Sequence, residues 1–218
     1  MSCSCASPCN PTARHFDERW ARRELAAYRR GGPGRTTRRL LDGLRATNAG
    51  LGTVLDIGAG IGTLTLGLLQ AGARLAVCVD FSAASMAVGA EEARRLGVGD
   101  RIEWLEGDFT AIAPGVPPAD VVTLDRVVCC YPEYAPLLEQ AADHCRRFLA
   151  MSYPRDRWYV RGALRAENAW RRFRGDPFRA FVHPVDAMVG LLRRHGFARV
   201  HRESTMSWNA DIYARTVP

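Results

Sequence analysis

The stretch from Val54 to Gly62 constrains the fold of this 218-residue chain more than any other feature; it reads Val-Leu-Asp-Ile-Gly-Ala-Gly-Ile-Gly. Its apolar start predicts a buried strand, its alternate glycines predict a tight turn, and the run Thr63 to Gln70 predicts a helix. Glycine permits positive φ angles and leaves no side chain over the turn, so a flat or extended ligand can lie on the main chain. The stretch therefore predicts an α/β fold with a binding surface at this turn.

The glycine spacing and one carboxylate indicate which cofactor this turn binds. A dinucleotide fingerprint, G-x-G-x-x-G, would need glycine at position 63, where the chain has Thr63. Asp56, two residues before the first glycine, would repel a diphosphate, but it can accept hydrogen bonds from the ammonium group of an amino-acid-like ligand. S-adenosylmethionine (SAM) carries such a group, and the stretch is similar to the first motif of class I SAM-dependent methyltransferases. A glycine-rich turn in another kind of α/β enzyme is the alternative.

An alternation of strands and helices follows the glycine turn. Continuous apolar strands predict a parallel sheet covered on both faces. The last two strands, expected at 197–203 and 207–214, are predicted to be antiparallel neighbours. We therefore expect a Rossmann-like, seven-stranded sheet that is mostly parallel with an antiparallel last strand. The earlier strands are expected at 53–57, 74–80, 102–107, 119–124 and 147–152, and the helices at 62–71, 82–96 and 136–144.

Acidic residues recur at the ends of the predicted strands, where ligands bind in an open α/β sheet. Asp80, followed by Phe81, lies about twenty residues beyond the turn, where it can accept both ribose hydroxyls. Asp108 is placed to accept from an exocyclic amine, with Phe109 beside it to pack on the ring. Asp125 ends the fourth strand and opens a stretch expected to face the methyl group. The predicted cofactor-binding residues are Asp56, Gly58, Gly60, Asp80, Phe81, Asp108, Phe109 and Asp125.

Residues 12–215 resemble the branch of class I methyltransferases that includes magnesium-protoporphyrin IX O-methyltransferase. The resemblance rests on Tyr28 ahead of a glycine-containing link, on the motifs around Asp56, Asp80 and Asp108, and on the stretch from Asp125 to Tyr131-Pro132. It implies methylation of a propionate carboxylate beneath an N-terminal arm that acts as a lid, and a catalytic role for Tyr28. The family has a histidine immediately before the Tyr-Pro pair, where this chain has Cys130. That departure concerns the porphyrin substrate and leaves the cofactor site untouched.

Methyl transfer from a sulfonium mainly requires a nucleophile held in line with the methyl carbon, at about 3 Å. A carboxylate nucleophile is already ionised at pH 7, whereas a phenol, an amine or a hydroxyl can need a base. Tyr28, Tyr131 and His183 are the candidate catalytic groups, and Cys130 and Tyr153 are candidate substrate contacts. His183 also fits a loop-capping role before Pro184, and Cys130 also fits simple packing.

Every basic residue of the chain is arginine, and the arginines concentrate in two segments. Residues 11–45 hold ten against four acids, and residues 151–182 hold eight against three. Both segments are expected to lie over the carboxyl ends of the strands, so we predict a cationic lid that attracts an anionic substrate. Arg155, Arg157 and Arg161 are its nearest candidates. Arginines on solvated helix faces, supplied by a compositional bias, are the alternative.

We expect a tail without regular structure at 1–10, a helical arm at 11–50 and a SAM-binding domain at 51–218. Within that domain, residues 155–182 are predicted to form a substrate-capping insertion. In the arm, Thr36 or Thr37 is predicted to cap the second helix. Residues 1–10 lack the basic start and apolar stretch of a signal peptide, and no membrane span is evident, so we expect a cytosolic protein. Cys3, Cys5 and Cys9 with His15 match no common zinc spacing, so no metal is predicted.

The predicted function is SAM-dependent methyl transfer to a small molecule, as O-methylation of an anionic, carboxylate-bearing substrate. One alternative is an RNA or DNA methyltransferase, because the net charge of +7 and the interleaved Trp158, Trp170 and Phe173 suit a polyanion with exposed bases. The sequence has no catalytic Asn-Pro-Pro-Tyr type motif, which argues against this alternative. The other alternative is a regulator that binds SAM without turnover.

Overall fold

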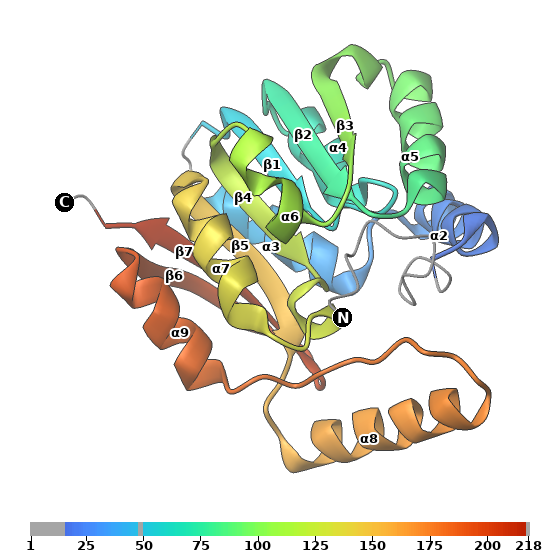
Figure 1. Cartoon of the computed structure of the whole chain (residues 1–218). Coiled ribbons are helices and arrows are strands. Elements are labelled where there is room, and N and C mark those ends of the chain that lie inside the picture. The colour runs from blue at the N-terminus through green and yellow to red at the C-terminus, as the bar shows by residue number, and fades with distance from the viewer. Residues whose placement is uncertain (1–15, 48–49, 217–218) are drawn as a thin grey trace.

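The computed structural model describes residues 16–47 and 50–216, and its centre is a seven-stranded sheet (Figure 1). The strand order is β3-β2-β1-β4-β5-β7-β6. β7 is antiparallel to both of its neighbours, and the other neighbouring strands are parallel, which confirms the predicted sheet. The strands are β1 (Thr53–Ile57), β2 (Leu75–Asp80), β3 (Ile102–Glu106), β4 (Ala119–Asp125), β5 (Cys145–Pro154), β6 (Phe197–Ser204) and β7 (Trp208–Arg215).

Helices cover both faces of the sheet because successive strand residues point to opposite sides. Val54 packs in an apolar cluster with α3 and α4, whereas Leu55 packs in a second cluster with α7 and α9. The helices are α2 (Glu18–Gly31), α3 (Arg35–Ala46), α4 (Thr63–Gln70), α5 (Ala83–Arg95), α6 (Phe109–Ile112), α7 (Tyr134–Asp143), α8 (Trp158–Phe173) and α9 (Val185–Arg194). Single turns of 3-10 helix occur at η1 (Gly99–Arg101), η2 (Ala113–Gly115) and η3 (Val128–Cys130).

The N-terminal helices differ from the sequence prediction in how they begin. Asp17 caps α2, because its carboxylate accepts the Trp20 backbone N–H at 2.8 Å. Gly34 occupies the N-cap of α3, so Thr36 and Thr37 lie inside the first turn and the predicted threonine cap is wrong. Both threonines are buried there.

Some predictions fall outside the described residues, namely those on the tail at 1–10 and on Cys3, Cys5, Cys9 and His15. Among the helices that the structure describes, none is long and apolar enough to cross a membrane. β5 is longer than predicted, since it runs from Cys145 to Pro154 and pairs with β4 on one side and β7 on the other.

Candidate functional site

A cavity of about 370 Å³ opens at the carboxyl ends of β1, β2 and β4. Strand ends and the glycine turn form its floor, and side chains of α2 and α8 form part of its roof. The structure brings most of the predicted site residues together here, because parallel strands end at one edge of the sheet. The predicted residues that line the cavity are Asp56, Gly58, Gly60, Asp80, Phe81, Phe109, Asp125, Cys130 and Tyr131.

Glycine is required at the three positions of the turn for different structural reasons. All of them have positive φ, at 67° for Gly58, 56° for Gly60 and 72° for Gly62. A Cβ on Gly58 would lie 2.5 Å from Val127, and one on Gly62 would lie 2.9 Å from Trp104, so packing excludes side chains there. A Cβ on Gly60 would meet nothing within 4 Å. Gly60 therefore leaves open space above the main chain, as a ligand cradle requires.

Asp56, the penultimate residue of β1, is a buried carboxylate with 2% of its surface exposed. It accepts hydrogen bonds from the hydroxyls of Thr65 at 2.8 Å and Thr123 at 2.6 Å. Burial raises the pKa of Asp56 to about 6. Each carboxylate oxygen can accept a further hydrogen bond, so a cation in the cavity would stabilise the ionised form.

Asp80 connects the end of β2 to the glycine turn. Its carboxylate accepts the backbone N–H groups of Gly60 and Ser82, both at 2.8 Å, and burial raises its pKa. These two bonds use one lone pair on each oxygen and leave the others for hydroxyl donors. Asp80 thus fixes the cradle and still presents acceptors to the cavity.

Asp108 and Tyr131 form one unit beside the cavity. Asp108 caps α6 by accepting the Thr110 backbone N–H at 3.0 Å, and the Tyr131 hydroxyl donates to the same carboxylate at 2.7 Å. Tyr131 lines the cavity, as does the buried Phe109 that follows Asp108. The structure therefore joins a predicted catalytic residue to a predicted cofactor-binding residue.

The end of β4 is held by both the N-terminal arm and β5. Asp125 accepts hydrogen bonds from the Thr37 and Ser152 hydroxyls, each at 2.5 Å. The next residue, Arg126, has φ of 63°, a left-handed conformation that is uncommon outside glycine and that concentrates at functional sites. Its guanidinium lies 3.8 Å from the Glu24 carboxylate of α2. Both contacts tie the arm to the cavity floor.

Aromatic side chains join the arm to the cap above the cavity. The Phe16 ring lies 4.7 Å from the Trp20 ring, 6.0 Å from the Phe81 ring and 5.6 Å from the Phe178 ring, measured between centroids. Phe16, Trp20, Phe81 and Phe178 all line the cavity. Where the sequence led us to expect arginines between the two segments, the structure has this edge-to-face aromatic cluster.

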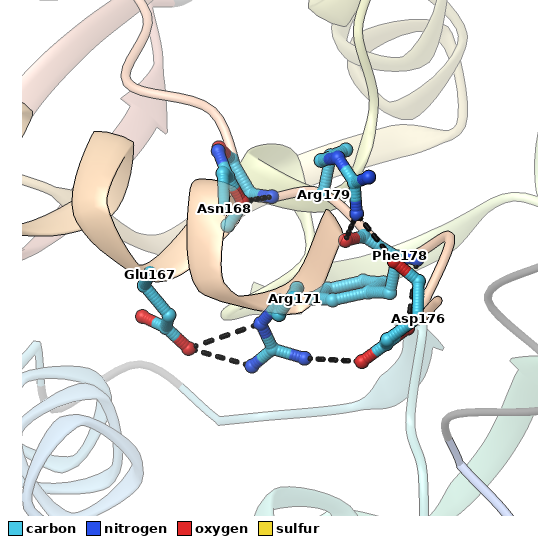
Figure 2. A network of polar contacts seen from close by, with 7 residues as sticks. Glu167, Asn168, Arg171, Asp176, Phe178 and Arg179 are labelled. Atoms are coloured by element: carbon cyan, nitrogen blue, oxygen red, sulfur yellow. Dashed lines mark hydrogen bonds and ion pairs between the residues drawn. The ribbon is translucent and has the colours of Figure 1, made fainter. Parts of the chain in front are cut away.

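A polar network fastens α8 to the segment that follows it (Figure 2). Arg171 pairs with Glu167 at 2.6 Å and Asp176 at 3.1 Å, and its guanidinium lies 5.0 Å from the centre of the Phe178 ring. The Asn168 side chain exchanges two hydrogen bonds with the Ala180 backbone, at 2.8 and 3.0 Å. The network makes α8 and residues 176–180 one cap, which contributes Arg171 and Phe178 to the cavity lining.

Two predicted tyrosines lie outside the cavity lining. Tyr28 of α2 packs against the apolar layer between the arm and the main domain, and burial raises its pKa. Tyr153 is buried in the core, where its hydroxyl donates to Asp211 at 2.6 Å. We therefore give neither residue a part in the proposed chemistry.

His183, Arg155 and Arg157 also lie outside the cavity lining. His183 is buried with Nε2 2.9 Å from the Tyr131 carbonyl oxygen, so it supports η3, and burial lowers its pKa. The Arg155 guanidinium donates to the Thr205 carbonyl at 3.0 Å, while Arg157 is exposed at the N-cap of α8. The described arginines that do line the cavity are Arg126 and Arg171.

The sequence did not predict that four hydroxyl residues hold the site carboxylates. A hydroxyl inside a helix or strand carries no motif, so only the tertiary structure reveals its partner. Phe16 and Trp20 did appear in the apolar stripe of the arm, as packing residues. The hydroxyl residues are Thr37, Thr65, Thr123 and Ser152.

Residues 54–151 match the family model described as a methyltransferase domain. A curated relative is ribosomal protein L11 methyltransferase from Enterobacter sp. (strain 638), which is 34% identical over 87 residues. That alignment covers 39% of this chain and spans only 28% of the relative's length. The glycine turn lies within the residues that match the family model.

Solved structures share the whole architecture. Magnesium protoporphyrin IX methyltransferase from Synechocystis PCC 6803, with bound SAH, has a TM-score of 0.69 and 22% identity, over 83% of this chain and 82% of that one. An O-methyltransferase family protein from Burkholderia thailandensis has a TM-score of 0.67 and 19% identity, over 92% of this chain and 63% of that one. At these identities the likeness shows the fold, and the Rossmann-like methyltransferase fold expected from the motifs is confirmed.

Proposed function

We propose that this chain, whose residues 54–151 form a methyltransferase domain on a class I methyltransferase fold, is a SAM-dependent methyltransferase acting on a small molecule. The observation that carries the proposal is the set of carboxylates at strand ends around one glycine cradle, beside a single cavity. When bound, SAM supplies an electrophilic methyl group on its sulfonium.

The residues of the cavity floor suit the parts of SAM. Asp56 would hold the ammonium group, because a buried carboxylate with spare acceptor capacity favours a cation. Asp80 would accept from the ribose hydroxyls, and Asp108 with Phe109 would recognise the adenine. The open space above Gly60 supports this assignment, since a Cβ there would fill the cradle without touching protein.

The size of the cavity favours a compact acceptor. About 370 Å³ is near the lower end of the range for small-molecule sites, roughly 300–1,000 Å³. Cofactor and acceptor share this space, so an acceptor as large as a macrocycle would require the arm or the cap to move. Cys130, Leu164, Phe178 and Trp208 line the side away from the cradle and suit an apolar body.

A carboxylate acceptor fits the charged groups of the lining. Among the described lining residues there is no histidine, and the Tyr131 hydroxyl already donates to Asp108. The lining carboxylates Glu24 and Glu167 pair with arginine, so a nucleophile that is ionised without a base is favoured. The described cations of the lining are Arg126 and Arg171, which already contact acidic side chains and would share their charge with the acceptor, in place of Arg155 and Arg157. We accordingly propose O-methylation of an anionic, carboxylate-bearing acceptor.

The test uses methyl-labelled SAM, the purified protein and a cell extract divided into small-molecule and nucleic-acid fractions. We expect label in the small-molecule fraction that mild base releases, as a methyl ester requires. An Asp80→Ala variant should label nothing, because it lacks the ribose acceptor. Label in nucleic acid would instead favour the RNA or DNA methyltransferase, and SAM binding without any labelled product would favour the regulator.

The cytosolic location stays a prediction.

A further inference from the structure

The outward side of α8 carries large aromatic side chains in solvent. Trp158 is 84% exposed and Phe173 is 82% exposed, and Val160 is the buried residue that the helix contributes to the body. At 3.6 residues per turn, Trp158, Gly162, Ala169 and Phe173 fall within roughly 60° of the helix surface. α8 stands apart from the sheet, at the bottom of Figure 1.

Neighbouring aromatic and sulfur-containing side chains extend this surface. Trp170 is 59% exposed and stacks on Phe173, with 5.8 Å between ring centroids. Met206, in the β6–β7 turn, is 80% exposed, and its carbonyl accepts the Tyr159 hydroxyl at 2.7 Å. We call Trp158, Trp170, Phe173 and Met206 the α8 patch. Large apolar patches that are exposed on a protein surface mark interaction sites.

Positive charge accompanies the α8 patch. Arg165 and Arg172 are exposed and lie beside the apolar sector, on the same outward side of the helix. The acids of the segment are already paired, since Asp156 lies 2.5 Å from Arg161, and Glu167 and Asp176 both contact Arg171. The segment therefore presents uncompensated arginine next to exposed tryptophan and phenylalanine.

We propose that the α8 patch docks this protein on a membrane surface that contains anionic lipids. A helix that presents Trp and Phe to solvent with arginines beside them on the same side is suited to lie in the plane of an anionic bilayer interface. Trp158 and Phe173 are fifteen residues apart, about 22 Å along one side of the helix, so a flat surface can receive both. Bases of a nucleic acid would instead need stacking platforms that follow a backbone groove.

Docking through this patch would place α8 between the lipid surface and the cavity. Leu164 and Glu167 of α8 line that cavity, while the α8 patch occupies the outward side of the helix. The docking proposal does not rest on the proposed function.

The test is co-sedimentation of the full chain with vesicles of phosphatidylcholine, with and without phosphatidylglycerol. We expect binding at least about tenfold tighter to the anionic vesicles, lost at about 0.5 M salt because the screening length falls to a few ångströms. A Trp158→Ser/Phe173→Ser variant should bind at least about tenfold more weakly, since a tenfold change corresponds to about 1.4 kcal/mol, within reach of burying one large apolar side chain. Arg165→Gln and Arg172→Gln should each cost roughly fivefold.

A matched control is Leu75→Ser/Val200→Ser, because Leu75 is 49% exposed and Val200 is 54% exposed and both lie outside the α8 patch. It should bind vesicles like the wild type, and every variant should keep the wild-type Tm as evidence of folding. Equal binding to both vesicle types, or no binding, would overturn the proposal. Loss of vesicle binding in the control would also overturn the proposal. The same holds if the patch variants lose only self-association, or only affinity for an RNA oligonucleotide, and keep vesicle binding.

Discussion

Replacing Asp56 by asparagine should stabilise the fold while it weakens cofactor binding. Asp56 is 2% exposed, and burial raises its pKa from 3.8 to about 6. At 1.36 kcal/mol per pKa unit, a rise of about two units means that the ionised carboxylate costs about 3 kcal/mol at neutral pH. The cost is absent below pH 3.8, where Asp56 is protonated in both folded and unfolded chains, and it is complete above pH 6.

Asparagine preserves the shape of the side chain and much of its bonding. Its carbonyl can accept one threonine hydroxyl, from Thr65 or Thr123, and its amide can donate to the other. We expect Asp56→Asn to gain about 2 kcal/mol at pH 7.5, which raises Tm by about 4–8 °C in a chain of this size. At pH 4.5 the cost of the carboxylate falls to about 1 kcal/mol, because the wild-type carboxyl is then largely protonated in the folded chain, so the gain should nearly vanish.

Thermal unfolding at both pH values and calorimetric titration with SAM would check this. Asp56→Asn should weaken SAM binding about 10- to 100-fold, the range for a lost hydrogen bond to a charged group. The matched control is Asp120→Asn at the other end of the sheet. Hydrogen bonds from Thr53 lower the pKa of Asp120, so its neutralisation should lower Tm. An unchanged or lower Tm for Asp56→Asn at pH 7.5, or a gain independent of pH, would refute the reasoning.

Three further outcomes are expected at the cavity. Gly60→Ala and Gly97→Ala should each lower the free energy of unfolding by roughly 1 kcal/mol, because both glycines have positive φ with open space around them. Gly60→Ala alone should also weaken SAM binding, by at least about tenfold. Urea unfolding and calorimetric titration compare the two variants. Tyr131→Phe removes the 2.7 Å bond to Asp108 and should raise the Kd for SAM about fivefold, with a smaller effect contradicting their coupling. SAM affinity should fall about tenfold per pH unit below 6 as Asp56 is protonated, and a flat binding profile from pH 7 to pH 5 would contradict this.

The floor of the cavity was predictable because it depends on local pattern and one topological rule. Asp56, Asp80 and Asp125 each end an apolar run, and strands of a parallel sheet end at one edge. All three line the same cavity. Gly58 and Gly60 follow from the same turn, since their positive φ angles are what alternate glycines permit.

The side chains around this floor were not predictable, because distant partners direct them. Tyr153 was expected at the substrate, yet its hydroxyl meets Asp211, 58 residues later in the chain. Thr37 was expected to cap a helix, yet it meets Asp125, 88 residues away. The arginine of the cap that lines the cavity is Arg171, and no spacing rule distinguishes it from the other arginines of residues 151–182.

The position of β7 imposes an order on how the protein can be assembled as it leaves the ribosome. β7 is synthesised after the six other strands, yet it lies between β5 and β6 and pairs with β5 from Phe148 to Pro154. Until Trp208–Arg215 emerges, a nascent chain that already holds the cavity floor carries β5 as an open edge. Open edges recruit strands from other chains, so premature termination before Trp208 should yield aggregates instead of a smaller folded protein.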